Sequence, residues 1–221
     1  MKVGVLGSGD VGQTLARGFA SRGHDVTIGS RDPEKVADFA KEAGIAAAAF
    51  DETAKFGELL VLATAFSGTK SAIDLAGAQN FSGKVVIDTT NPLKFEEGKL
   101  PSLAIGFSDS AGESVQRWLP DAKVVKAFNI VGHGYMVDPD IPGGPPTMFI
   151  AGNDAEAKKI VADILTAFGW QNEVIDIGAI EEARYLESLC MLWVHYAIRA
   201  GSTHARVQTA AGCAQLMVTA P

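Results

Sequence analysis

A glycine-rich turn near the start of the chain restricts the possible folds more than any other feature. It follows the apolar run Val3 to Leu6, and apolar residues recur after it at helical spacing as far as Phe19. In the G-x-G-x-x-G turn of a dinucleotide-binding βαβ unit, the glycines form the tight turn, let the backbone approach a pyrophosphate and let the helix lie close to the sheet. The anion lies at the helix N-terminus, where free N–H groups and the helix dipole favour it. We therefore predict a pyrophosphate site, rather than a turn that binds nothing, at Gly7, Ser8, Gly9, Asp10, Val11 and Gly12.

The end of the next predicted strand indicates which dinucleotide binds. A site specific for NAD carries Asp or Glu near the end of this strand, 25–29, to hold the ribose 2′-hydroxyl. This chain has Ser30 and Arg31 there, with Lys35 in the helix that follows. A hydroxyl and two cations suit a 2′-phosphate, so we predict NADP(H) rather than NAD(H). Asp32 competes for the ribose role, but an aspartate before a proline also fits a helix cap, and we prefer that interpretation.

Composition and charge exclude several classes of protein. The 221 residues are 47% hydrophobic and 20% charged, which is typical of a globular protein with a sizeable core. The formal net charge is −7. A general nucleic-acid surface or a surface for anionic membranes needs a broad basic patch, so neither is expected.

No pattern in the chain is typical of a metal site, a redox disulfide or a membrane span. The cysteines, Cys190 and Cys213, have neither C-x-x-C nor zinc-ligand spacing, and Cys190 is expected in a helix core. The first strand begins directly after Met1, so no signal peptide is expected. The longest late apolar stretch, Leu186 to Ile198, is too short to cross a bilayer. We expect a cytoplasmic protein without a metal.

Strand and helix patterns alternate along the chain, which is typical of a parallel sheet covered by helices on both faces. Continuous apolar runs predict buried strands at 3–6, 25–29, 45–50, 59–63, 85–88, 123–127, 147–151 and 172–177. Helices are predicted between the glycine turn and Gly23, and near 33–43, 70–78, 113–119, 154–168 and 180–199. The expected fold class is α/β, a Rossmann-type doubly wound and mostly parallel sheet with a small C-terminal α/β extension.

Turn-forming residues at 138–146 mark the best candidate for a boundary. We expect an NADP-binding Rossmann domain over 1–145 and a small C-terminal α/β part over 146–200. The final stretch, 201–221, has few large apolar residues and no clear helical stripe, so a mobile or atypical tail is predicted there.

Four motifs follow one another along residues 1–200. They are the glycine turn with Gly29-Ser30-Arg31, then Asp88-Thr89-Thr90-Asn91-Pro92-Leu93, Val124-Val125-Lys126-Ala127-Phe128-Asn129, and Asp176-Ile177-Gly178 followed by Ala183-Arg184-Tyr185-Leu186-Glu187. Together they resemble the NADPH-dependent deazaflavin reductases, or coenzyme F420:NADP oxidoreductases, and their relatives at the cytosolic end of STEAP metalloreductases. The resemblance implies an enzyme that transfers hydride between NADPH and a deazaflavin, a flavin or a similar acceptor.

The resemblance also implies roles for individual residues. Ser8 to Val11 would contact the pyrophosphate, and the 2′-phosphate would be held by Ser30, Arg31 and Lys35. The loops that follow the carboxyl ends of later strands, where ligands bind in open α/β sheets, would provide the other cofactor-binding residues. These are Thr64, Ala65, Phe66, Asn91, Pro92, Leu93, Ala127 and Asn129.

Two of these positions have a competing structural explanation. Asn91 and Pro92 are expected to form a rigid turn. The backbone of this turn would hold the nicotinamide carboxamide, or the turn would simply end a strand. Asn129 offers a donor and an acceptor to a ligand, or makes a structural bond from its side chain to the backbone. By the resemblance, archaeal deazaflavin reductases carry a histidine where this chain has Asn129. This departure leaves the electron acceptor open.

No catalytic side chain is predicted, because the cofactors carry the hydride transfer while the protein supplies alignment and electrostatics. A non-catalytic NADPH-binding redox sensor is an alternative, since a fold does not prove turnover. A small hydroxyacid or imino-acid dehydrogenase is a weaker one, because those enzymes use a lysine in a long helical second domain and no lysine follows Lys159 here. The expected partner is a small-molecule redox acceptor. A homodimer is a further expectation. Its contact surface would be an apolar stripe on the last predicted helix, although such a stripe more often belongs to the core. The stripe consists of Leu189, Leu192, Trp193 and Tyr196.

Overall fold

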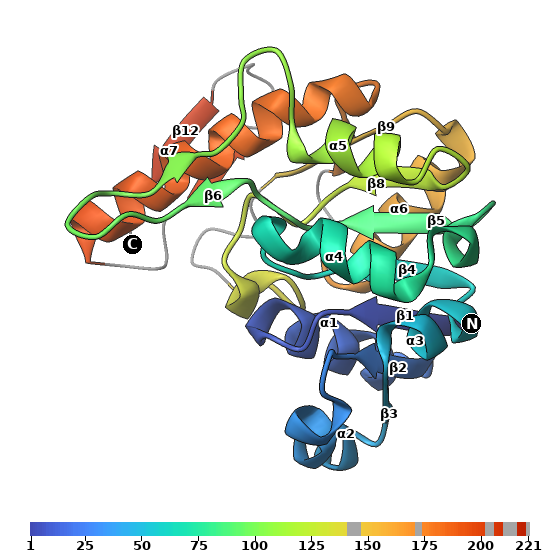
Figure 1. Ribbon diagram of the computed structural model, residues 1–221. Helices are drawn as coiled ribbons and strands as arrows, with labels where there is room; N and C mark the ends of the chain where they lie inside the picture. Colours follow the sequence, from blue (N-terminus) through green and yellow to red (C-terminus); the bar gives the residue numbers. More distant parts are fainter. Residues whose placement is uncertain (141–146, 171–173, 202–205, 210–215, 220–221) are drawn as a thin grey trace.

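A sheet of eight strands organises the computed structural model (Figure 1), which describes residues 1–140, 147–170, 174–201, 206–209 and 216–219. Neighbouring strands of this sheet are parallel except for one antiparallel pair, β8 with β9. The order is β10 (Val174–Asp176), β9 (Met148–Gly152), β8 (Lys123–Lys126), β5 (Val85–Asp88), β4 (Leu59–Leu62), β1 (Lys2–Leu6), β2 (Asp25–Gly29) and β3 (Ala46–Ala48). The predicted doubly wound, mostly parallel α/β fold is confirmed.

Helices bury one apolar core on each face of the sheet, as expected for strands that are apolar on both sides. Val3 and Val5 belong to the first core, together with side chains of α1 (Asp10–Ser21), α2 (Ala37–Ala43) and α6 (Ala155–Ala167). Leu60 and Leu62 belong to the second core, together with side chains of α3 (Phe50–Phe56), α4 (Phe66–Ala76) and α5 (Ala111–Trp118).

The C-terminal helix α7 (Ala183–Ala200) packs against α5 and β9 after a short 3-10 turn, η4 (Ile180–Glu182). Between β5 and α5 the chain forms a two-stranded antiparallel hairpin, β6 (Leu93–Lys94) with β7 (Ser102–Leu103), which lies against α7 (Figure 1). In this contact the His195 Nε2 atom is 2.7 Å from the carbonyl oxygen of Pro101. Further 3-10 turns are η1 (Pro33–Val36), η2 (Ala78–Phe81) and η3 (His133–Tyr135).

The largest difference from the sequence predictions lies between β3 and β4. The predicted strand 45–50 is reduced to β3, because Phe50 begins the helix α3, which the sequence analysis missed. Phe50 and Ala54 lie one helical turn apart and are both buried. A helix of 7 residues is too short for periodicity to reveal it. Similarly, α4 begins at Phe66 rather than near Lys70.

The predictions for the C-terminal third are tested only in part. Residues 141–146 of the predicted boundary loop lie outside the described residues, as do 202–205, 210–215 and 220–221 of the predicted tail. Within that tail, β11 (Arg206–Thr209) and β12 (Leu216–Thr219) pair in antiparallel orientation. Because β9 and β10 continue the main sheet, the division at residue 145 stays a prediction. Among the described residues, no helix is both long enough and apolar enough to cross a membrane.

Candidate functional site

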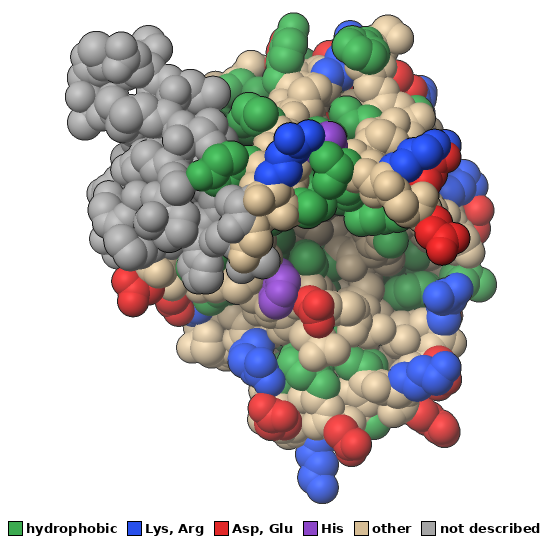
Figure 2. All heavy atoms as spheres, turned by 90° about the vertical axis from the view of Figure 1, so that its left-hand side faces the viewer, with side chains coloured by type: hydrophobic (Ala, Val, Ile, Leu, Met, Phe, Trp, Pro, Cys, Tyr) green, Lys and Arg blue, Asp and Glu red, His purple; other side chains and the backbone are tan. Residues whose placement is uncertain are grey.

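A cavity of about 830 Å³ opens where β1, β2 and β4 end. Figure 2 looks at this end of the molecule and shows that the surface is hollowed there. The walls come from the turn after β1, the segment after β2, the end of β4 and the first turns of α4. The predicted cofactor residues that line it are Gly7, Ser8, Gly9, Ser30, Arg31, Lys35, Thr64 and Ala65.

The glycine turn has the close packing that its sequence pattern predicts. Gly7 has a φ of +130°, and a Cβ atom there would lie 2.3 Å from the Ala63 carbonyl oxygen. A Cβ atom on Gly12 would lie 1.9 Å from the Gly7 carbonyl oxygen, whereas one on Gly9 would meet nothing within 4 Å. Gly7 and Gly12 thus allow the strand, turn and helix to pack together, and Gly9 leaves space for a ligand.

The first turn of α1, which includes the predicted Asp10, Val11 and Gly12, fits an anion. Gly9 is at the N-cap position, and within the described residues no side chain caps this helix end. Its first N–H groups and the positive end of the helix dipole therefore face the open side of the turn. The Gln13 side chain donates to the Ser8 carbonyl oxygen at 2.9 Å and holds the turn in place.

The segment after β2 brings together the three residues predicted to bind a 2′-phosphate. The Ser30 hydroxyl accepts from Ser8 Oγ at 3.3 Å and from the Asp32 backbone N–H at 3.2 Å. Arg31 is exposed and has no ion pair with any described residue. Lys35 Nζ lies 3.3 Å from Asp32 Oδ2, with the two side chains 81% and 47% exposed. The group offers one hydroxyl, one unpaired guanidinium and one weakly paired ammonium.

The predicted role of Asp32 as a helix cap is wrong. Asp32 does occupy the N-cap position of η1, with Pro33 following as expected, but its side chain makes no capping hydrogen bond. The carboxylate turns instead towards Lys35, three residues later, because opposite charges at this spacing attract each other.

The residues predicted on the nicotinamide side are not all brought to the cavity. Thr64 and Ala65 line it, and the Thr64 hydroxyl is 2.8 Å from that of Thr69. The Phe66 ring stacks on Trp118 of α5 instead, with 5.8 Å between the ring centroids and an interplanar angle of 20°. Five others lie beyond the cavity lining, after β5 and β8, namely Asn91, Pro92, Leu93, Ala127 and Asn129.

Asn91 and Asn129 join the ends of β5 and β8 through a pair of hydrogen bonds. Asn91 Nδ2 donates to the Asn129 backbone carbonyl at 2.8 Å, and Asn129 Nδ2 donates to Asn91 Oδ1 at 3.0 Å. Asn129 is 3% exposed, and its Oδ1 finds no hydrogen-bond donor among the described residues. The Asn129 side chain thus makes a structural bond, but to the side chain of Asn91 rather than to the backbone as predicted, and its Oδ1 acceptor is left over.

Sequence reasoning missed a buried group of charges behind this pair. Lys126 Nζ lies 2.8 Å from Asp88 Oδ2 and 2.9 Å from Glu187 Oε1, and it donates to the Thr90 carbonyl at 2.6 Å. Glu187 also accepts from two N–H groups at the start of α5. Burial raises the pKa of Glu187 even though Lys126 opposes the shift. Cys190 is 2% exposed, which confirms its predicted place in the core, and burial raises the pKa of its thiol to about 12.

Part of this group was visible in the sequence. Asp88 ends one predicted strand, Lys126 is the last residue but one of another, and these strands are neighbours in the sheet, so their pairing follows from strand order. Glu187 lies on a helix more than 60 residues away along the chain, and no local pattern links it to Lys126. The cavity residues Ser67 and Gly68 of α4 were missed because that helix begins earlier than predicted, whereas Ser71 lies within the predicted helix and was not recognised as a cavity residue.

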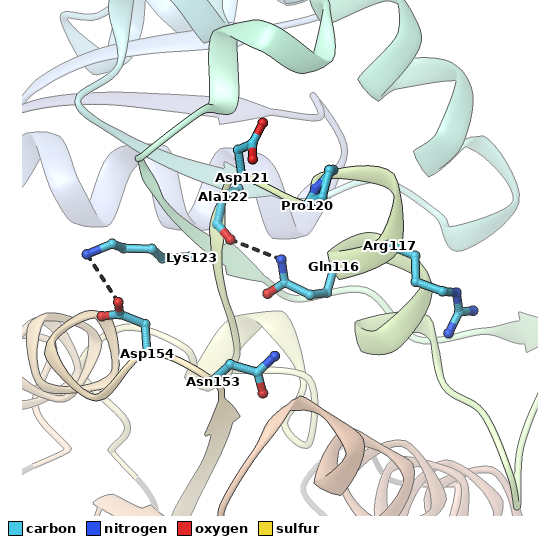
Figure 3. Close-up of a pocket in the computed structure, with 8 residues that line it drawn as sticks. All are labelled: Gln116, Arg117, Pro120, Asp121, Ala122, Lys123, Asn153 and Asp154. Atoms are coloured by element: carbon cyan, nitrogen blue, oxygen red, sulfur yellow. Dashed lines mark hydrogen bonds and ion pairs between the residues drawn. The ribbon is translucent and has the colours of Figure 1, made fainter.

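A second cavity, of about 620 Å³, is less suited to a ligand (Figure 3). It lies at the start of β8, at the opposite end of the sheet from the glycine turn. Its polar groups bind one another. Lys123 Nζ is 3.2 Å from Asp154 Oδ2, and Gln116 Nε2 donates to the Ala122 carbonyl at 3.0 Å. Within the described residues, no group of three or more His, Cys, Asp or Glu side chains is arranged to hold a metal ion.

Comparisons with known proteins point to one family. Residues 2–92 match the family model for NADP oxidoreductases that depend on coenzyme F420. The F420-dependent NADP reductase of Methanocaldococcus jannaschii is 32% identical over 207 residues, covering 88% of this chain and 91% of that protein. The metalloreductase STEAP3 of Rattus norvegicus is 28% identical, over 85% of this chain but 36% of that protein. A crystal structure of a candidate F420-dependent NADP reductase from Arthrobacter sp. FB24 has a TM-score of 0.91 and 40% identity, and covers 95% of this chain and 99% of that one.

Proposed function

This chain belongs to the family of F420-dependent NADP reductases, and from that premise we propose that it transfers hydride between NADPH and a deazaflavin, a flavin or a similar acceptor. It is an NADP-dependent oxidoreductase. The observation that carries the assignment is the cavity in which the uncapped start of α1 faces the Ser30 and Arg31 segment. These two features suit the pyrophosphate and the 2′-phosphate of one dinucleotide.

The dinucleotide would be held by residues from successive strand ends. The pyrophosphate would lie on the backbone at Gly7, Ser8, Gly9, Asp10, Val11 and Gly12, and the 2′-phosphate on Ser30, Arg31 and Lys35. The nicotinamide half would extend across the end of β4 towards β5 and β8, in the order in which these strands lie in the sheet. The residues assigned to it are Thr64, Ala65, Phe66, Asn91, Pro92, Leu93, Ala127 and Asn129.

When bound, the nicotinamide supplies the hydride chemistry, and no side chain needs to act as acid or base. The chain contributes binding and orientation. The glycine turn holds the phosphates by backbone N–H groups, and the amide pair of Asn91 and Asn129 fixes the spacing of the strand ends beyond β4. Such alignment of two rings lowers the entropic part of the barrier to hydride transfer.

Three finer features belong to the same proposal. The dinucleotide domain would span 1–145, and the C-terminal part 146–200, followed by a tail over 201–221. The protein would be cytoplasmic. It would form a homodimer through Leu189, Leu192, Trp193 and Tyr196 of α7, of which Leu192 is 53% exposed and the other three are half-buried. Leu189 and Leu192 border an apolar cavity of about 420 Å³. Light scattering on the purified protein tests the dimer directly.

The experiment that tests the proposed function is turnover with defined acceptors. Purified protein is mixed with NADPH, or with NADH as the control, and then with deazaflavin, FMN or FAD while loss of the reduced nicotinamide is followed. We expect rapid oxidation of NADPH with one of these acceptors and slow oxidation of NADH. Tight binding of NADPH with no oxidation by any acceptor would instead identify a redox sensor.

A further inference from the structure

We propose that the side-chain carbonyl of Asn129 accepts a hydrogen bond from the carboxamide N–H of the nicotinamide ring and so sets the ring's position for hydride transfer. This inference rests on the proposed function, since it requires NADP to be bound in the cavity described above with its nicotinamide half extending beyond the cavity lining, to the ends of β5 and β8. It makes Asn129 the residue that distinguishes the carboxamide from other substituents at the same ring position.

The first observation is that the Asn129 amide has a fixed orientation. Asn91 Nδ2 donates to the backbone carbonyl of Asn129, so Asn91 Oδ1 is left to accept from Asn129 Nδ2. Turning either amide over would place two donors or two acceptors opposite each other. Asn129 Oδ1 is therefore held facing away from Asn91.

The second observation is that this oxygen is buried without a partner. Asn129 is 3% exposed, and no described residue donates to its Oδ1. A buried acceptor that has lost its water without gaining a donor destabilises the fold, and native structures contain few of them. A ligand with an N–H group would explain why such an acceptor is present, because the bound ligand supplies the missing donor.

The backbone before Asn129 directs the side chain. Phe128 has a φ of +63°, a left-handed conformation that is unfavourable for a residue with a side chain. Its ring is fully buried and lies 5.9 Å from the Phe168 ring, measured between centroids. Packing of Phe128 thus holds the strained turn, which determines how the chain leaves β8 and where Asn129 lies.

The position of Asn129 in the sheet favours the nicotinamide, rather than the ring of the electron acceptor, as the group that Asn129 contacts. The strands run in the order β2, β1, β4, β5 and β8, and the two predicted phosphate sites lie at β2 and β1. A dinucleotide that crosses the strand ends from there brings its nicotinamide half towards β5 and β8. The acceptor ring would stack on the face of the nicotinamide that is turned away from the sheet, so a buried atom at a strand end would meet the nicotinamide first. The donor on that ring is the N–H group of its carboxamide.

The test compares the binding of two dinucleotides that differ only at this group. In 3-acetylpyridine adenine dinucleotide phosphate an acetyl group replaces the carboxamide, so the N–H donor is missing while the phosphates are unchanged. Calorimetry on the native protein is expected to give a Kd for the analogue that is at least about tenfold higher than that for NADP. A ratio near one in the native protein overturns the inference without any variant.

A variant then assigns the discrimination to Asn129. We expect Asn129→Leu to bring the Kd ratio close to one, because it removes the acceptor oxygen. If Asn129→Leu keeps the native ratio but raises the KM for the deazaflavin, the residue serves the acceptor and the inference is wrong. The proposed function is judged separately, because native protein that fails to prefer NADP over NAD contradicts that proposal whatever the analogue does.

Discussion

Lys126 and Glu187 form an ion pair inside the core, with Nζ 2.9 Å from Oε1 and side chains 0% and 2% exposed. Lys126 ends β8 and Glu187 belongs to α7, so the pair ties the C-terminal helix to the strand that leads to Asn129. Burial by itself lowers the pKa of Lys126, but the carboxylates of Asp88 and Glu187 raise it above its usual value. The ammonium therefore stays charged and holds both carboxylates.

Replacing this lysine should strongly destabilise the protein. Lys126→Met leaves Asp88 and Glu187 buried without their cation, and breaking a buried pair in this way costs about 3–5 kcal/mol. Urea unfolding measures the change. The matched control is Lys159→Met, because Lys159 is 67% exposed and pairs with Asp163 on the surface of α6. We expect the control to change the free energy of unfolding by less than about 0.5 kcal/mol. A similarly small effect of Lys126→Met would show that the buried group contributes little.

The loss of unfolding free energy at acid pH should depend on Glu113. Burial favours the neutral form of this carboxyl, but hydrogen bonds from Arg184 and Ser110 hold its pKa below the usual value of 4.5. A group with a lowered folded-state pKa stabilises the fold above its unfolded pKa, and this contribution is lost as pH falls through the folded value. Unfolding free energies measured from neutral to acid pH should therefore fall less steeply for Glu113→Gln than for the native protein. Parallel curves would contradict this role.

Local patterns were enough to predict most of the fold. Apolar runs such as Val85 to Asp88 gave the strands because they are buried on both faces, and the glycine turn gave the βαβ unit. The helix α3 was missed because 7 residues show too little periodicity. The partner of Asp32 was predicted wrongly. Its position before a helix is visible in the sequence, but this position does not determine whether the carboxylate bonds to the helix N–H groups or to Lys35.

The candidate site was predictable where it depends on one stretch of chain. Ser30 and Arg31 follow β2 directly, so their place beside the glycine turn follows from the parallel pairing of β1 with β2. The link between Asn91 and Asn129 joins segments 38 residues apart, and Glu187 reaches the site from α7. Such contacts depend on how helices and loops pack against the sheet, and no spacing in the sequence encodes them.

Two glycines of the turn should respond differently to the same substitution. In Gly12→Ala the new Cβ would lie 1.9 Å from the Gly7 carbonyl oxygen, so we expect a loss of at least about 2 kcal/mol in unfolding free energy. In Gly9→Ala the Cβ meets no protein atom within 4 Å. The fold should tolerate it, with a similar melting temperature, while the Kd for NADP rises because the methyl group occupies the phosphate space. Unchanged affinity in Gly9→Ala would place the pyrophosphate elsewhere.

Arg31 should decide between the two forms of the dinucleotide. It has no ion pair among the described residues and lines the cavity, as does the preceding residue Ser30. A charged hydrogen bond to a phosphate contributes about 1.5–3 kcal/mol, so Arg31→Ala should raise the Kd for NADPH by about 10- to 100-fold. The Kd for NADH should change by less than about twofold. Arg17→Ala is the control, since Arg17 pairs with Glu42 on the exposed side of α1 and should leave both values unchanged. Equal losses for NADPH and NADH would contradict the role of Arg31.

Asp32 should weaken NADP binding, and its removal should therefore improve it. Its carboxylate lies 3.3 Å from Lys35 Nζ, in a largely exposed pair that contributes little to stability. In Asp32→Ala the ammonium is free to meet the 2′-phosphate and a repelling charge is gone, so we expect the Kd for NADPH to fall by about two- to fivefold at low salt, and less at high salt. Melting temperature should not change, because the side chain caps no helix end. A loss of about 1 kcal/mol in unfolding free energy would restore the capping role. Weaker binding of NADH and NADPH alike would instead mean that Asp32 holds a ribose hydroxyl.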